Sequence, residues 1–195
     1  MRESDNLAER YPVIFFYVLA FVISWMGWVA QAVFQSENPL LNLLGGGGPT
    51  LAAVLVLLIM GERERISDLF KALFRMRAGA WWFVFTLGYW FIVGTIALFV
   101  LRLTGKELSG LNQFAWASLI PVFIAMLLSN VWEEIGWRGF ALPRLRNRLS
   151  DLQVSLVMGA LWFLWHLPLM LNPGSPMSAL PWYGELLFSL SLTVI

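Results

Sequence analysis

The chain of 195 residues has no cysteine, a single histidine and few charged side chains. Without cysteine there is no disulfide framework, no thiol nucleophile and no cysteine-ligated metal. Charged residues make up 13% of the chain, whereas an ordinary soluble domain has about 25%. The formal net charge of +1 argues against nucleic acid as a partner, because nucleic-acid-binding domains are strongly basic.

Apolar residues are present in large excess. They make up 59% of the chain, which includes 11 Trp and 15 Phe, and the mean hydropathy is +0.72. A water-soluble domain of this length could not bury so much apolar surface, and the same composition excludes a disordered chain. It predicts an all-α, multi-pass transmembrane helical bundle in the cell membrane, with the lipid bilayer as its surroundings.

Six segments are apolar enough for the roughly 20 residues that a membrane-crossing helix requires. They are Pro12–Phe34, Leu40–Met60, Ala80–Leu103, Phe114–Ala141, Val154–Leu171 and Leu180–Ile195. The last segment is still apolar at the final residue, so we expect this span to be cut off there. The prediction is therefore one membrane domain over residues 1–195 that is incomplete at its C-terminus.

The connection between the second and third segments is basic and amphipathic. Its apolar residues follow helical spacing, which predicts an amphipathic helix over residues 62–77 lying on the membrane surface. A solvated connector with one hydrophobic side explains the pattern equally well. Of the 13 Lys and Arg residues in the chain, eleven fall in the N-terminal tail and in the loops on its side of the membrane. The positive-inside rule therefore predicts a cytoplasmic N-terminus.

The second segment contains the run from Gly45 to Pro49, with four glycines and a proline. Such a run weakens a helix, but small residues also let a neighbouring helix approach closely. We expect close packing here, and a mobile or substrate-contacting break is the alternative.

Three charged residues stand at the end of the fourth apolar segment: Glu133, Glu134 and Arg138. Each ionised group within a membrane costs at least ~2.5–3.5 kcal/mol, so three together are hard to explain as accidents. Glu134 and Arg138 are four residues apart, hence on one helical face and able to pair. Glu133 is rotated by about 100° and faces a different environment. A carboxylate without a cation partner suits a general base.

The single histidine, His166, follows in the fifth apolar segment. A lone histidine on an apolar helix is usually a hydrogen-bonded core residue. However, the basic connector before this segment turns near Leu149 or Ser150, about midway between Glu133 and His166. An antiparallel hairpin then brings the carboxylate and the imidazole to the same depth. That pairing predicts proton handling or metal binding.

These residues resemble the motifs of the CPBP family, which includes CAAX prenyl endopeptidases and bacteriocin-processing or immunity proteins of the Abi group. Residues 133–138 fit the family's EExxxR motif. Residues 162–166 match its FxxxH motif, with Trp162 in place of Phe, and a Leu-Pro pair follows as is typical. The sequence Gly-Pro-Thr-Leu-Ala-Ala from Gly48 is a further likeness.

The resemblance implies an intramembrane endopeptidase that cleaves a membrane-associated peptide or protein substrate. By position, Glu133 activates the attacking water and His166 holds that water. Glu134 and Arg138 support the site, and Arg138 contacts a substrate carboxylate or the developing oxyanion. A divalent metal such as zinc, held by Glu133 and His166, would make the protein a metalloprotease. The family's second histidine, on a later helix, is missing from this chain, so activity of the chain alone is in question.

Two other functions remain open at the level of sequence. A non-catalytic immunity or scaffold protein of the same fold would use Glu134, Arg138 and His166 only to brace the bundle. A proton-coupled transporter would relay protons between Glu133 and His166. The sequence has no internal repeat that would favour a transporter.

Overall fold

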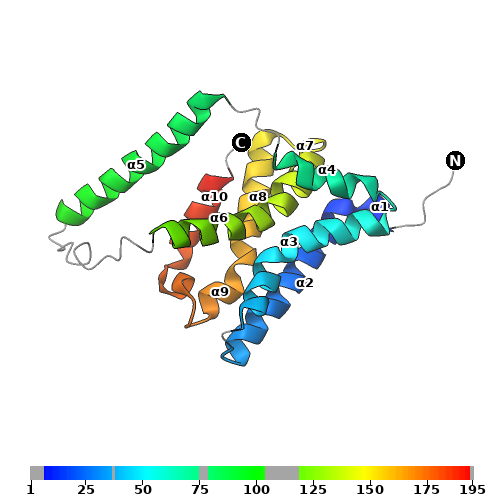
Figure 1. Ribbon diagram of the computed structural model, residues 1–195, viewed down its shortest axis with the longest axis horizontal. Coiled ribbons are helices and arrows are strands. Elements are labelled where there is room, and N and C mark those ends of the chain that lie inside the picture. Colours follow the sequence, from blue (N-terminus) through cyan, green and yellow to red (C-terminus); the bar gives the residue numbers. More distant parts are fainter. Residues whose placement is uncertain (1–6, 37, 75–78, 104–118, 194–195) are drawn as a thin grey trace. The chain divides into compact units, whose positions relative to one another are not determined.

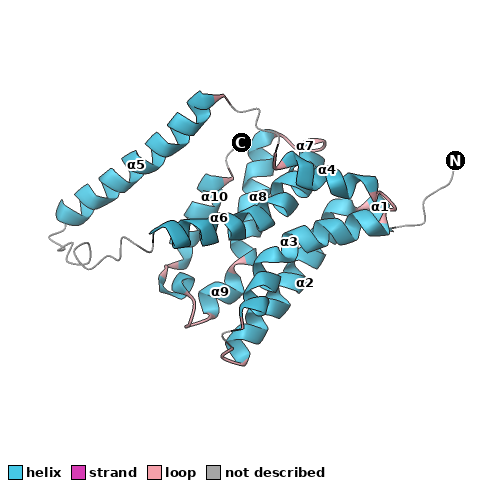
Figure 2. Ribbon diagram, viewed as in Figure 1, coloured by secondary structure: helices cyan, strands magenta, loops and turns pink. Residues whose placement is uncertain are grey.

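The computed structural model describes residues 7–36, 38–74, 79–103 and 119–193. Within these ranges the chain forms helices joined by turns and contains no β-strand (Figures 1 and 2). The predicted all-α class is confirmed, and the helices are consistent with a membrane helical bundle.

The chain divides into two compact units, Met1–Leu73 with Ala125–Ile195, and Phe74–Ile124. The second unit contains helix α5 (Ala80–Leu103) and the first residues of α6 (Leu119–Gly136). All candidate site residues belong to the first unit. The single membrane domain over residues 1–195 stays a prediction.

Helices α2 (Pro12–Val33) and α3 (Pro39–Ile59) lie side by side in the first unit (Figure 1), after the short helix α1 (Leu7–Arg10). Their close approach depends on small residues. A Cβ atom at Gly27 would lie 2.6 Å from the carbonyl oxygen of Leu41, and one at Gly48 would overlap the Ser24 hydroxyl. Helix α3 is continuous through Pro49. Within the glycine run, Gly45 and Gly48 therefore serve the expected close packing, whereas Gly46 and Gly47 face open space.

Helix α4 (Glu64–Ala72) occupies the middle of the predicted amphipathic segment. Its Leu69 is buried against Gly139, whereas Phe74, just beyond the helix, is 82% exposed. The apolar side of α4 thus contributes to the core of the first unit. Residues 75–77 of the predicted helix lie outside the described residues, and its place on the membrane surface stays a prediction.

Helix α6 runs directly into a π-helical segment, η3 (Trp137–Ala141), and then into α7 (Leu142–Arg146). Helix α8 (Asp151–Trp165) begins with a capping box, in which Ser150 and Gln153 bond each other's backbone N–H groups. The turn between the two arms therefore lies where the sequence predicted it, before residue 151.

The remaining helices return along α8. Helix α9 (Leu167–Leu171) and the 3₁₀ helix η4 (Pro176–Ala179) lead to α10 (Trp182–Leu192). At Gly159 of α8 an added Cβ atom would lie 2.6 Å from Thr193 Oγ1, and that hydroxyl donates to the Ser155 carbonyl oxygen at 2.9 Å. The absence of a side chain at Gly159 lets the two helices pack closely.

Three stretches of the described residues are long and apolar enough to cross a membrane, namely Pro12–Val33, Pro39–Ile59 and Asp151–Leu171. They coincide with the first, second and fifth predicted spans. The fourth predicted span begins among residues outside the described ranges, and the full number of spans stays a prediction.

Candidate active site

Glu133 lies on α6 and its side chain is buried, with 8% of the residue exposed. The indole N–H of Trp162, on α8, donates to Glu133 Oε2 at 3.1 Å. The indole of Trp137, one turn along from Glu133, also lies beside the carboxylate but outside hydrogen-bond geometry. The two arms of the predicted hairpin, α6 and α8, are therefore in contact at Glu133. The hydrogen bond that joins them there is donated by a neutral group, the Trp162 indole.

Glu134 forms the predicted ion pair with Arg138. The second terminal nitrogen of the same guanidinium, Nη2, donates to the carbonyl oxygen of Leu192 at 2.9 Å. This carbonyl belongs to the last turn of α10, where backbone oxygens lack helical partners. Arg138 therefore ties η3 to the end of α10.

His166 occupies a break between helices α8 and α9. Pro168 has no backbone N–H, so α8 cannot continue through it as a regular helix. Helix α8 ends at Trp165, and the Trp165 carbonyl oxygen accepts a hydrogen bond from the Trp25 indole at 3.0 Å. The helix break leaves the Trp165 carbonyl oxygen without a helical partner, and the Trp25 indole of α2 supplies one. Together they fix the backbone position of His166.

Three indole rings surround the His166 imidazole. The ring centroids of Trp165, Trp162 and Trp28 lie 4.8, 5.0 and 6.3 Å from that of His166. The histidine is only 9% exposed. An apolar surround of this kind excludes bulk water and strengthens the electrostatic interactions of the few polar groups within it.

The charged partner of His166 is Glu185 of α10, a residue that the sequence analysis missed. His166 Nδ1 lies 3.2 Å from Glu185 Oε1, at ion-pair distance although off the direction of a hydrogen bond. Glu185 is 2% exposed, and Ser189 Oγ donates to the same oxygen at 3.3 Å. Glu185 is the only charged residue of the segment Leu180–Ile195. Its isolation in an apolar run was the signal that could have revealed it.

Glu133 and His166 come together through Trp162. Within the described part of the chain no hydrogen bond or ion pair joins the two directly. Trp162 bonds Glu133 through its indole N–H and packs its ring against His166. A cavity of about 10 Å³ adjoins Trp162, Glu134 and Arg138, which is roughly the space of one water molecule.

No three or more His, Cys, Asp or Glu side chains of the described residues are placed to hold a metal ion together. His166 Nδ1 faces Glu185, and Glu133 and His166 offer only two of the three protein ligands that a catalytic zinc site usually has. These residues therefore do not fit the predicted metal site by themselves.

The fold and the site define an all-α membrane protein with a buried carboxylate–imidazole centre. Residues 114–195, which include every candidate site residue, match the family model described as Type II CAAX prenyl endopeptidase Rce1-like. The chain is also 24% identical over 174 residues to CAAX prenyl protease 2 from Methanococcus maripaludis, an alignment that covers 82% of this chain and 63% of that protein. These two findings confirm the resemblance to the CPBP family of CAAX proteases. The chain spans less than two thirds of the relative's length.

Proposed function

We propose that the chain carries the centre of an intramembrane endopeptidase, which hydrolyses a peptide bond of a membrane-associated peptide or protein. The observation that supports this proposal is the position of Glu133 and His166 on the two sides of Trp162. Both lie among the residues that match the endopeptidase family model.

In the proposed reaction Glu133 is the general base. Its carboxylate takes a proton from a water molecule while the water oxygen attacks the carbonyl carbon of the substrate. The proton then passes to the leaving nitrogen as the C–N bond breaks. Glu133 is bonded by a neutral indole, whereas Glu134 is paired with a guanidinium, so Glu133 is the carboxylate without a cationic partner.

His166 is proposed to hold the attacking water by accepting a hydrogen bond from it at Nε2, since Nδ1 faces Glu185. Glu185 then acts as a positioning residue that orients the imidazole. The Glu134–Arg138 pair is proposed as a brace, because the guanidinium already bonds the Leu192 carbonyl oxygen. Contact of Arg138 with a substrate carboxylate or oxyanion stays a prediction.

The first substrate class to test comes from the relative's name. The relative is named CAAX prenyl protease 2, so we propose as the substrate a peptide that ends in a CAAX motif, in which the prenylated cysteine is followed by three residues. The comparison peptide has the same sequence without the prenyl group. A preference for the prenylated peptide would support this class, whereas equal cleavage of both would contradict it.

The sharpest test of the proposed base replaces Glu133 with glutamine. In lipid nanodiscs, Glu133→Gln should lower cleavage of a quenched fluorescent peptide by about 10²–10⁴-fold, because positioned general bases contribute that much. The matched control is Glu64→Gln, which changes an exposed carboxylate of α4 and should cleave as the unmodified protein does. Normal cleavage by Glu133→Gln would show that another group is the base.

The same assay tests the predicted divalent metal. Because the described side chains at the site do not offer a full set of metal ligands, we expect cleavage to persist after treatment with 1,10-phenanthroline and removal of the chelator. Loss of cleavage that returns on adding Zn²⁺ would overturn this expectation and restore the metalloprotease interpretation.

A non-catalytic scaffold of the same fold is the second candidate. The observation that favours it is the link from Glu134 through Arg138 to the Leu192 carbonyl oxygen, which braces three helical segments without requiring any reaction. In a scaffold, Glu133→Gln would leave the biological effect of the protein in cells unchanged. In a protease the effect would disappear.

A further inference from the structure

We propose that the first unit binds the headgroup of an anionic glycerophospholipid in a pocket between the start of α2 and the connector from α7 to α8. The pocket has a volume of about 390 Å³. Its lining comes from Tyr11 to Ile14 on one side and from Arg144, Leu145 and Asn147 to Leu149 on the other. This inference is independent of the proposed proteolysis and needs only that the protein is inserted in a membrane.

The pocket lies at the level where two candidate spans begin. Pro12, the first residue of one span, lines it, and Leu149 stands two residues before Asp151, the first residue of another. Tyr11 belongs to the aromatic residues that favour the membrane–water boundary. Lipid phosphates lie at this boundary, so a pocket here is within reach of a headgroup.

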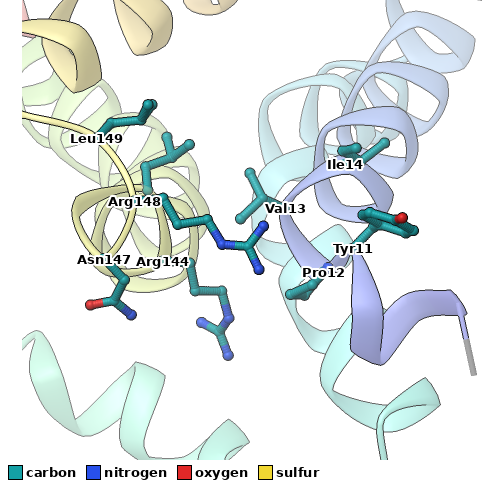
Figure 3. Close-up of a pocket in the computed structure, with 9 residues that line it drawn as sticks. Tyr11, Pro12, Val13, Ile14, Arg144, Asn147, Arg148 and Leu149 are labelled. Carbon is teal, nitrogen blue, oxygen red and sulfur yellow. The ribbon is translucent and has the colours of Figure 1, made fainter. Parts of the chain in front are cut away.

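The charges that face the pocket are positive. Figure 3 shows the guanidinium group of Arg148 extending toward Val13 and Pro12 of α2, with the guanidinium group of Arg144, on α7, below it. None of the lining residues is acidic. The start of α2 adds the partial positive charge of a helix N-terminus. A planar guanidinium group can donate two parallel hydrogen bonds to two oxygens of one phosphate, and a phosphate diester offers two such oxygens.

Arg144 and Arg148 differ in the number of interactions that each already forms within the protein. Arg144 donates to the Phe140 carbonyl oxygen at 3.0 Å and lies 3.8 Å from Glu62, so it is held in place. Arg148 is exposed and forms no ion pair with any residue that the structure describes. By contrast, Arg146 is paired with Asp151 at 3.0 Å. Arg148 is therefore the cation left available for a ligand.

The apolar part of the lining selects a lipid over a free phosphate. Val13, Ile14, Leu145 and Leu149 form walls that a phosphate ion would leave uncovered, whereas the glycerol and first methylene groups of a lipid would bury them. A basic pocket between helices near the membrane surface is a recognised kind of site for anionic lipid headgroups.

The test is native mass spectrometry of the whole chain, released from detergent with equal amounts of phosphatidylglycerol and phosphatidylcholine. We expect one phosphatidylglycerol to be retained in preference to phosphatidylcholine. Arg148→Gln should weaken its retention about tenfold. The matched control is Arg146→Gln, which removes the same charge from the same connector and should bind as the unmodified chain does. Equal retention of both lipids, or equal behaviour of the two variants, would overturn the proposal.

Two further experiments distinguish a lipid from a free phosphate and show where on the protein the lipid binds. Millimolar inorganic phosphate should not displace the lipid, and displacement would identify a free phosphate as the ligand. Val13→Trp fills the pocket from α2 while both arginines remain. It should lose phosphatidylglycerol although its circular dichroism and elution volume are unchanged, and retention of the lipid by this variant would place the binding elsewhere.

Discussion

The imidazole of His166 has two nitrogen atoms, and Nδ1 faces a carboxylate. Glu185 lies 3.2 Å from Nδ1 and is itself almost fully buried. Burying a carboxylate in an apolar interior is costly unless a partner compensates for it. The imidazole is the partner that the buried carboxylate has in this part of the chain, and a carboxylate beside Nδ1 favours the tautomer with the proton on Nδ1.

Because His166 is the only histidine in the chain, its tautomer can be measured without assignment. In protein labelled with ¹⁵N-histidine and carrying no histidine tag, we expect one tautomer with the proton on Nδ1. Glu185→Gln should mix the tautomers and lower kcat about tenfold, with KM unchanged, because the imidazole loses its orientation but not its place.

Ser189→Ala serves as the control for this substitution, since it removes only the second partner of the Glu185 carboxylate. It should keep the single tautomer. A single, unchanged tautomer in Glu185→Gln would show that Glu185 is a structural residue only.

The sequence predicted the Glu134–Arg138 pair and the contact of Glu133 with α8, but it did not predict the contact of Glu185 with His166. Helical spacing alone gives the Glu134–Arg138 pair, because residues four apart share a face. The meeting of Glu133 with α8 follows from counting residues on both sides of a turn. The approach of Glu185 to His166 depends on how α10 packs on α8 at Gly159, which no local spacing encodes.

At the scale of elements, the glycines of α3 divide into those at a helix contact and those facing open space. A Cβ atom at Gly48 would overlap the Ser24 hydroxyl and lie 2.9 Å from the Ala20 carbonyl oxygen. At Gly46 it would meet nothing within 4 Å. The two positions therefore form a matched pair for substitution by alanine.

Gly48→Ala should lower the free energy of unfolding by about 1–3 kcal/mol, the usual cost of overpacking. Gly46→Ala should leave stability unchanged or raise it by up to about 1 kcal/mol, because alanine favours the helix. Thermal unfolding in detergent measures both. If Gly48→Ala were as stable as Gly46→Ala, the two helices would not be in close contact at this position.

Composition and periodicity predict helices well but miss their irregularities. The starts of α2 and α3 coincide closely with the predicted spans, because each helix begins where its apolar run begins. The π-helical turn η3 was not predictable, since its sequence also suits a regular helix. It depends on the packing of Trp137 and Phe140 around Phe16 of α2.

At the scale of the whole molecule, the orientation in the membrane follows from the distribution of basic residues and stays a prediction. The absence of cysteine makes it directly testable. Ser36→Cys places a thiol between α2 and α3, and Lys71→Cys places one on α4. With a cytoplasmic N-terminus, a membrane-impermeant maleimide should label Ser36→Cys in intact cells. Lys71→Cys should react only after permeabilisation, and the reverse pattern would invert the topology.

Helix α10 follows all the other described helices in the chain, yet it supplies Glu185 to His166 and the Leu192 carbonyl oxygen to Arg138. During synthesis the earlier helices therefore leave the ribosome while His166 and Arg138 still lack these partners. These two contacts form only when α10 joins the earlier helices. Under the proposed function, a nascent chain is therefore expected to cleave no substrate before this late step.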